Sequence, residues 1–387
     1  MTVKITKPEI NVREKISELD KPSGIAGQAM LAAETPQEQF NLIGAGRRNL
    51  IINGAMQVEQ RGAYTISTTG SPEYGGPDRF HVWSYTSGEE VTAEISKSTV
   101  GGTPTGFADT YRIDVLTAES SVAAGEMLAF AQYIEAQNCQ HLEYGTSDAK
   151  SVTLSFWIKT SVTGTYCFFL QNSDGDRIQV KEYTVNSADT WEKKIITIPG
   201  DASGTINNDN GRGLWCGWVL MAGTDRHGSK DAWRTTGADY ATSSQVNAVH
   251  STANNIYFTG VQLEVGDTAT PFEHLTYAEE LLACERYYRA AHYYRTGILP
   301  WAGSAGGTAQ ATWPLDPTMR AAPTVTAPVT PTYSSTTGTA GPNAQTGTTA
   351  HASVTRGATT KSVQISNNAT GATIYAVTVQ LVLNAEL

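Results

Sequence analysis

Two loop-like stretches place aromatic rings beside hydrogen-bonding side chains. One runs from Arg226 to Trp233 and includes His227, and the other runs from Tyr74 to Phe80. Sugar rings present apolar C–H faces that stack on Trp and Tyr, while polar neighbours bind the hydroxyls. The stretches therefore predict glycan contacts, with Trp233 and His227 as candidates. Each loop could instead pack its aromatic side chain back on the body of the protein.

The sequence carries no motif typical of catalysis or of a metal centre. It lacks G-x-S-x-G, H-E-x-x-H and P-loop motifs, and its seven histidines never fall at metal-ligand spacing. Asn172–Asp176 suggests calcium, but an EF-hand loop needs Gly and Glu where Arg177 and Tyr183 stand, so we predict a hairpin turn. Glycoside hydrolysis needs two carboxylates across a cleft, and no spacing singles out a pair among Asp78, Glu143, Asp174, Asp176 and Glu264. We expect no enzyme and no cofactor; a structural calcium ion stays open, with no ligands assigned.

The charge balance argues against two classes of partner. The 387 residues include 27 Lys and Arg against 37 Asp and Glu, a net charge of −10. Phosphate binding and adhesion to anionic membranes both need concentrated positive charge, so we expect neither nucleic acid nor a membrane as partner. No run of 18 apolar residues predicts a transmembrane helix, and the N-terminus does not resemble a signal peptide. Cys139, Cys167, Cys216 and Cys284 form no C-x-x-C motif, so we expect buried free thiols in a protein made in a reducing cytoplasm.

Residues 47–275 read as a succession of strands. Val152, Leu154, Phe156 and Ile158 alternate onto one face, and the turn at 172–176 separates strands at 165–171 and 177–185. Strands of this length with no long helix between them predict an antiparallel β-sandwich, for which we choose a jelly-roll topology. Trp157, Trp215 and Trp218 lie in apolar strands and are expected in its core.

Three further segments flank this sandwich and complete a mainly β chain. Residues 1–46 carry signals for short helices but too few apolar positions for a core, so we expect them to dock on other proteins. Thr276–Glu279 is a capping box that predicts a connecting helix over 276–296. Residues 297–387 hold little charge and alternate in places, which predicts a small C-terminal β-sandwich domain.

Two groups of side chains in these flanking segments are candidates for contacts. Tyr277, Leu281, Cys284 and Tyr288 would form one apolar stripe on the connecting helix, packing on the body or around a symmetry axis. In the C-terminal domain, the candidate glycan contacts are Trp301, Trp313, Tyr333 and Tyr375.

Several motifs together resemble a family of tailed-bacteriophage virion proteins that includes tail fibres. The opening motifs are RNLIINGAMQVEQRG at 48–62 and PDRF at 77–80. The closing motifs are TGVQLEVG at 259–266, ATPFEH at 269–274, YAEEL at 277–281 and CERYY at 284–288. The resemblance covers about residues 47 to 290, and PTMRAAPT at 317–324 is similar to the start of the C-terminal module of such proteins.

The resemblance implies a homotrimeric tail fibre located in the virion, with a carbohydrate-binding-module-like jelly roll. It would bind host surface glycans without cleaving them, attach to other virion proteins through residues 1–46, and reach the host with residues 297–387 as its tip. A head fibre or decoration protein remains an alternative. A polysaccharide depolymerase is a further one, although no repeat of about 20 to 25 residues is visible.

Overall fold

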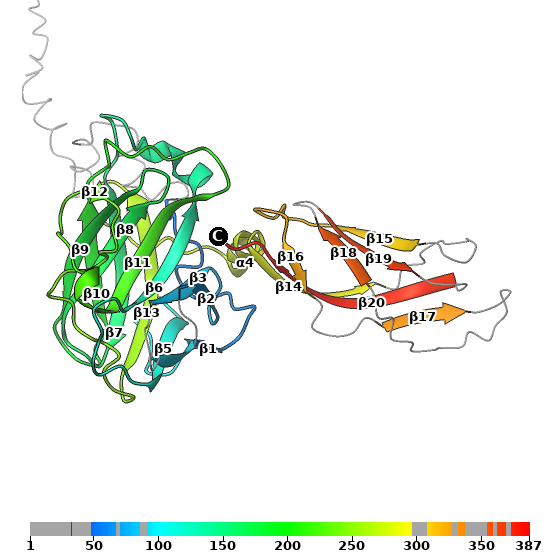
Figure 1. The fold of residues 1–387 in the computed structure, drawn as a ribbon, viewed down its shortest axis with the longest axis horizontal. Coiled ribbons are helices and arrows are strands. Elements are labelled where there is room, and N and C mark those ends of the chain that lie inside the picture. The colour runs from blue at the N-terminus through cyan, green and yellow to red at the C-terminus, as the bar shows by residue number, and fades with distance from the viewer. Residues whose placement is uncertain are drawn as a thin grey trace, which may run out of the picture.

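The computed structural model describes Ala32 and residues 48–66, 70–85, 91–295, 308–326, 332–336, 354–358, 362–368 and 373–387. Apart from Ala32, the predicted attachment segment 1–46 lies outside the described residues. The strands pair antiparallel in two large and two small sheets (Figure 1). The prediction of a mainly β chain is confirmed.

The two large sheets form a sandwich. One has the order β1-β4-β5-β13-β7-β10, with β1 at Tyr64–Ile66, β4 at Thr92–Ser98, β5 at Thr110–Thr117, β13 at Asn255–Val265, β7 at Val152–Thr160 and β10 at Glu192–Ile198. The other has the order β12-β9-β8-β11-β6-β3-β2, with β12 at Arg234–Thr235, β9 at Arg177–Val185, β8 at Gly164–Asn172, β11 at Arg212–Ala222, β6 at Met127–Glu135, β3 at Phe80–Tyr85 and β2 at Pro72–Tyr74. Two 3₁₀ helices, η1 at Ala136–Leu142 and η2 at Thr224–Arg226, follow β6 and β11.

Alternation of apolar side chains builds the core between these sheets. The four residues predicted to share one face of β7 are all fully buried. Phe130 of β6 stacks on Phe258 of β13 with ring centroids 4.5 Å apart, and it lies 5.3 Å from Trp218 of β11. The predicted hairpin is confirmed, because β8 and β9 pair from Gly164 opposite Val185 to Asn172 opposite Arg177.

Of the three tryptophans expected in the core, only Trp157 lies elsewhere. Trp218 is fully buried between the sheets, as predicted. Trp157 is only half-buried, because it follows the alternate face of β7. Trp215 is buried, but in a second apolar cluster on the far face of the seven-stranded sheet. The four cysteines are free and buried, as expected.

The connecting helix is much shorter than predicted. Helix α4, Tyr277–Glu285, starts at the predicted capping box, in which the hydroxyl of Thr276 accepts from the backbone of Glu279. The prediction of helix as far as 296 is wrong, because β14 at Tyr288–Arg295 pairs with β20 along its whole length. Its aromatic side chains favour a strand, and β20 supplies the hydrogen-bonding partner.

The predicted apolar stripe is therefore broken. Cys284 is buried within its own chain, whereas Tyr277 is 56 % exposed. Leu281 is half-buried, and Tyr288 lies beyond the helix beneath the guanidinium of Arg61, 3.5 Å from its ring centroid. These contacts remove the stripe as a reason to expect a symmetry axis at this helix.

The C-terminal β-unit starts at Tyr288 rather than at 297. One small sheet has the order β14-β20-β16, with β17 also paired to β20; β16 is Thr324–Thr326, β17 is Thr332–Thr336 and β20 is Thr373–Asn384. The other has the order β15-β19-β18, with β15 at Thr308–Pro314, β19 at Ser362–Asn368 and β18 at Val354–Ala358. Figure 1 shows these strands extending away from the sandwich, with α4 at their base. Among the helices described, none is both long and apolar enough to span a bilayer.

Candidate functional site

The opening and closing sequence motifs meet in space. The side-chain amide of Asn49 donates to the carbonyl of Val261 at 3.0 Å, and its oxygen accepts from the backbone of Leu263 at 3.0 Å. The side chain of Asn53 donates to the carbonyls of Val58 and Asp78 at 2.9 and 3.0 Å. These motif residues fasten the two ends of the sandwich, so their role here is structural.

A second set of motif residues fastens the C-terminal unit to the sandwich. Arg61 and Arg79 both pair with the carboxylate of Glu386, whose side chain is 5 % exposed. Arg286 donates to Glu135 at 3.0 and 2.6 Å, and Arg320 donates to the carbonyls of Ala385 and Glu386. We call this set the arginine junction; its members are Arg61, Arg79, Arg286, Arg320, Glu135 and Glu386.

A carboxyl group beside the arginine junction has an unusual environment. Asp78 is 1 % exposed, and Gln60 donates to it from its backbone at 3.0 Å and from its side chain at 2.6 Å. Burial raises the pKa of Asp78 to about 6, although the bonds from Gln60 and the charge of Arg61 oppose that rise. Asp78 therefore keeps its proton up to a higher pH than an exposed aspartate does.

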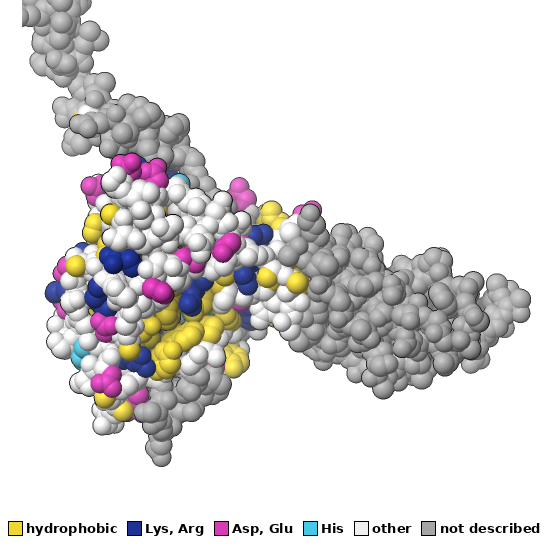
Figure 2. Space-filling model, turned by 45° about the horizontal axis from the view of Figure 1, so that its top comes forward, with side chains coloured by type: hydrophobic (Ala, Val, Ile, Leu, Met, Phe, Trp, Pro, Cys, Tyr) yellow, Lys and Arg dark blue, Asp and Glu magenta, His cyan; other side chains and the backbone are white. Residues whose placement is uncertain are grey.

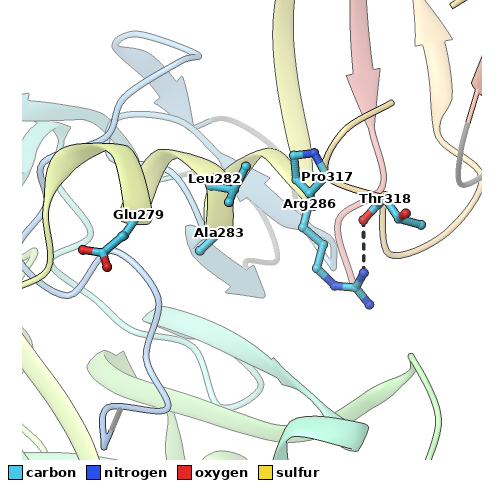
Figure 3. A pocket seen from close by; sticks show the side chains of 6 residues that line it. All are labelled: Glu279, Leu282, Ala283, Arg286, Pro317 and Thr318. Atoms are coloured by element: carbon cyan, nitrogen blue, oxygen red, sulfur yellow. Dashed lines mark hydrogen bonds between the residues drawn. The ribbon is translucent and has the colours of Figure 1, made fainter. Parts of the chain in front are cut away.

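An open hollow of about 370 Å³ lies between α4 and the 317–318 segment (Figure 3). Its polar lining consists of Glu279, Arg286 and Thr318. The carboxylate of Glu279 accepts from the backbone and the hydroxyl of Thr276 in the capping box. Arg286 donates from all three side-chain nitrogens, to Glu135 and to the carbonyl of Thr318. Its charged side chains are thus committed to the fold, so it is a weak candidate for a binding site.

The loop candidates for glycan contact serve the structure of their own loop. The indole of Trp233 donates to the carbonyl of Pro199 at 2.7 Å and meets Tyr144 edge to face at 5.8 Å. His227 is half-buried, with its ring nitrogen Nε2 3.3 Å from the carbonyl of Ala222. These contacts favour the packing interpretation of this loop. The Tyr74–Phe80 stretch is likewise largely buried.

Of the C-terminal candidates, Trp301 and the side chains of Trp313, Tyr333 and Tyr375 lie outside what is described. The last three are placed by backbone alone, on β15, β17 and β20. The Asn172–Asp176 turn contains no group of three or more His, Cys, Asp or Glu side chains arranged for a metal, nor does any other part of the chain that the structure describes.

The outer face of the seven-stranded sheet carries a row of aromatic rings that sequence reasoning missed. Tyr133 of β6 lies 5.5 Å from Trp215 of β11, Trp215 lies 5.2 Å from Trp83 of β3, and Trp83 lies 5.6 Å from Tyr85 of β3. We call these four rings the aromatic strip. Tyr240, from the loop before β13, flanks Trp215 at 5.6 Å.

Part of this face is open to solvent. Trp83, Tyr85, Ala222, Tyr240 and Leu387 are only partly buried where they pack on the apolar cluster around the strip. Figure 2 shows a contiguous hydrophobic patch on the larger sandwich, with Lys and Arg side chains at its border. Monomeric proteins seldom expose such patches without a binding role.

Two indole groups within the strip lack hydrogen-bond partners. Neither the Nε1–H of Trp83 nor that of Trp215 has an acceptor among the described residues, although both atoms are buried. Buried donors are almost always paired, with protein, water or ligand. The indole of Trp218 in the closed core is unpaired as well, so the position of Trp83 at the open part of the face, and not the missing partner, is what favours ligand contact.

An arginine side chain lies over each end of the strip. The guanidinium of Arg212 lies 4.9 Å from the ring centroid of Tyr133 and 5.5 Å from that of Trp215. That of Arg226 lies 4.4 Å from the ring centroid of Tyr85. Tyr133 and Trp215 are buried, at 1 % and 3 % exposed, so the ring faces open to a ligand are those of Trp83 and Tyr85, with a charged donor at each end of the strip.

The alternation of side chains along strand β3 could have revealed this face. In β3, Phe80 and Val82 point into the core, so His81, Trp83 and Tyr85 must share the opposite face. Aromatic residues on the face that would normally meet water indicate a contact surface. Trp215 lies on the same face and is nevertheless buried, as expected, because its strand is apolar on both faces.

The comparisons with known proteins show only distant similarity. No family model matches the chain, and no curated protein sequence matches it. Among solved structures, the enzymatically active domain of tailspike protein 4 from bacteriophage CBA120 is 12 % identical over 56 % of this chain and 21 % of its own, with a TM-score of 0.32. The family 11 carbohydrate-binding module of a Clostridium thermocellum cellulosomal cellulase is 15 % identical over 53 % of this chain and 100 % of its own, with a TM-score of 0.28. The CBM22-1 xylan-binding domain of Paenibacillus barcinonensis Xyn10C is 10 % identical over 58 % of this chain and 100 % of its own, with a TM-score of 0.25.

Proposed function

We propose that this chain is a structural virion protein of a tailed bacteriophage, a tail fibre that attaches to the host surface by binding glycans along the aromatic strip. The observation that carries glycan binding is the strip itself, in which the partly exposed rings of Trp83 and Tyr85 lie beside the buried rings of Tyr133 and Trp215. Stacked rings bind the C–H faces of sugars, and the indole N–H groups suit their hydroxyls. The virion role rests on the resemblance of the opening and closing motifs.

The proposal moves the binding face from the C-terminal tip to the larger sandwich. On the larger sandwich, the strip is favoured over the Arg226–Trp233 loop, because Trp233 and His227 bond to backbone carbonyls of their own surroundings whereas Trp83 and Tyr85 are partly exposed. Residues 1–46 are proposed to attach the fibre to other virion proteins.

Recognition without cleavage is part of the proposal. A glycosidase needs one carboxylic acid and a second carboxylate beside the sugar. Glu264 is buried and accepts from Thr270, Asp78 accepts from Gln60, and Glu135 is held by Arg286. These carboxylates are committed to the fold, which supports a binding role.

The purified full chain is expected to bind at least one polysaccharide in a set of bacterial capsular polysaccharides and lipopolysaccharide O-chains, and to release no reducing ends during long incubation. Surface plasmon resonance measures the binding, and a reducing-sugar assay measures cleavage. Release of reducing ends that one carboxylate substitution abolishes would replace this proposal with a depolymerase. Absence of binding across the set would contradict glycan recognition.

A homotrimer is the second expectation of the fibre proposal. Tyr277 and Leu282 on α4 are 56 % and 53 % exposed, so they are available to neighbouring chains. Sedimentation equilibrium is expected to give three times the 41.4 kDa chain mass. A single-chain mass that does not change with protein concentration would contradict it.

A further inference from the structure

We propose that the aromatic strip selects acidic polysaccharides, with Arg212 and Arg226 binding anionic groups carried by two separate sugars of one chain. This inference rests on the proposed function and names the class of glycan. Its basis is the pair of arginines at the two ends of the strip.

These arginines differ from most others in the described chain. Arg61, Arg79, Arg112, Arg177, Arg234, Arg286 and Arg289 each form an ion pair with a carboxylate. Among the described residues, neither Arg212 nor Arg226 has a carboxylate within 4.0 Å. Within the described part of the chain, Arg226 donates to two carbonyls, from Nε to Gly125 at 2.8 Å and from Nη1 to Ala238 at 3.4 Å. In a protein of net charge −10, two arginines without an acidic partner on one face leave room for an anionic ligand.

The chemistry of the arginine side chain suits this ligand. A guanidinium binds carboxylate, sulfate or phosphate oxygens through paired hydrogen bonds, and it is weakly hydrated, so it gives up water readily. Contact with the rings of Tyr85, Tyr133 and Trp215 holds each guanidinium near the strip before the ligand arrives. A neutral glycan would use the rings and the indole donors but would have no need of the two cations.

The positions of the arginines predict a polymer rather than a single sugar. Arg212 opens strand β11, and Arg226 lies in η2, just beyond its other end at Ala222. Strand β11 has eleven residues, each rising about 3.3 Å, and the two guanidinium groups lie over rings at opposite ends of the strip, so we expect them to bind different sugars of one chain. A polysaccharide with repeated acidic groups would cross the rings between them.

Matched pairs of polymers distinguish the contribution of the acidic groups to binding from that of the sugar backbone. The full chain would be titrated with polygalacturonate and its fully methyl-esterified form, and with dextran sulfate and dextran, at physiological salt. Tryptophan fluorescence is the readout, because Trp83 and Trp215 form the middle of the strip. The first pair tests carboxylates and the second tests sulfates, while the backbone within each pair stays the same.

The acidic member of at least one pair is expected to bind at least tenfold more tightly than its neutral partner. Arg212→Gln and Arg226→Gln should each weaken that binding by about tenfold, the usual loss for a charge-assisted hydrogen bond. Lys193→Gln is the matched control, since it removes one exposed charge from β10 on the opposite sheet.

Several results would overturn the selection of acidic glycans. It is contradicted if neutral polymers bind as tightly as acidic ones, or if the arginine variants bind like the wild type. It is also contradicted if neither acidic polymer binds. Equal loss in Lys193→Gln would also contradict it, because attraction would then come from overall charge. A neutral glycan whose binding falls in Trp83→Ala but not in the arginine variants would leave the proposed function intact and remove this inference alone.

Discussion

Replacing Arg79 with methionine is expected to lower the free energy of unfolding by about 3–5 kcal/mol, the usual effect of breaking a buried ion pair. The Arg79 side chain is 1 % exposed, pairs with Glu386 and donates to the carbonyl of Tyr133 at 2.8 Å. Methionine keeps much of the volume but leaves the Glu386 carboxylate with Arg61 as its remaining ion-pair partner. Urea unfolding followed by tryptophan fluorescence measures the change.

A surface arginine gives the matched control. Arg112 pairs with Asp114 at 2.7 Å, with both side chains about a quarter exposed, so Arg112→Met should cost at most about 1 kcal/mol. If Arg79→Met does not fold, Glu386→Gln probes the same contact more gently and should still cost more than Arg112→Met. A loss below that of the control in both junction variants would show that the arginine junction does not hold the C-terminal unit in place.

Replacing Asp78 with asparagine is expected to change how stability depends on pH. The pKa of Asp78 is raised from 3.8 to about 6 in the folded protein, so the folded state binds a proton more tightly than the unfolded state. The stabilisation from this proton is complete below about pH 4 and is lost as the pH rises through 6, amounting to about 3 kcal/mol. Asparagine cannot titrate, so this part of the pH dependence should disappear.

The comparison uses the difference between wild type and Asp78→Asn, measured by urea unfolding at pH 4, 5, 6 and 7. Taking the difference cancels carboxylates whose pKa shifts in the other direction, such as Glu192, whose pKa is about 2 despite the opposing effect of burial because Lys194 and nearby backbone groups bond to it. Asp225→Asn, on the exposed η2 turn, controls for the substitution itself. A difference that stays constant across this pH range would show that Asp78 titrates normally.

Local patterns predicted the sandwich well. The alternation from Val152 to Ile158, the hairpin turn at 172–176 and the capping box at Thr276 all act within a few residues, so the sequence displays them directly. The end of α4 did not follow from local pattern, because it depends on pairing between β14 and β20, some ninety residues apart. Strand pairing over such a distance overrides a helical spacing of apolar residues.

The aromatic strip shows a different limit of sequence reasoning. Its rings come from β3, β6 and β11, whose strands are neighbours only because of the sheet order. Trp215 is 3 % exposed and resembles a core residue in every local respect. Only the register of Trp215 opposite Tyr133, and the ring contact with Trp83, place it on the outer face.

Glycan binding along the aromatic strip is tested by measuring the affinity of the Trp83→Ala variant. Trp83 is the half-buried ring in the middle of the strip, and its loss should weaken binding of the tightest capsular or O-chain polysaccharide by about tenfold or more, as for an aromatic residue at the centre of an interface. Trp233→Ala, which removes the same side chain from the loop before β12, should bind like the wild type. Unchanged affinity in Trp83→Ala together with a loss in Trp233→Ala would contradict the account and return the binding site to that loop.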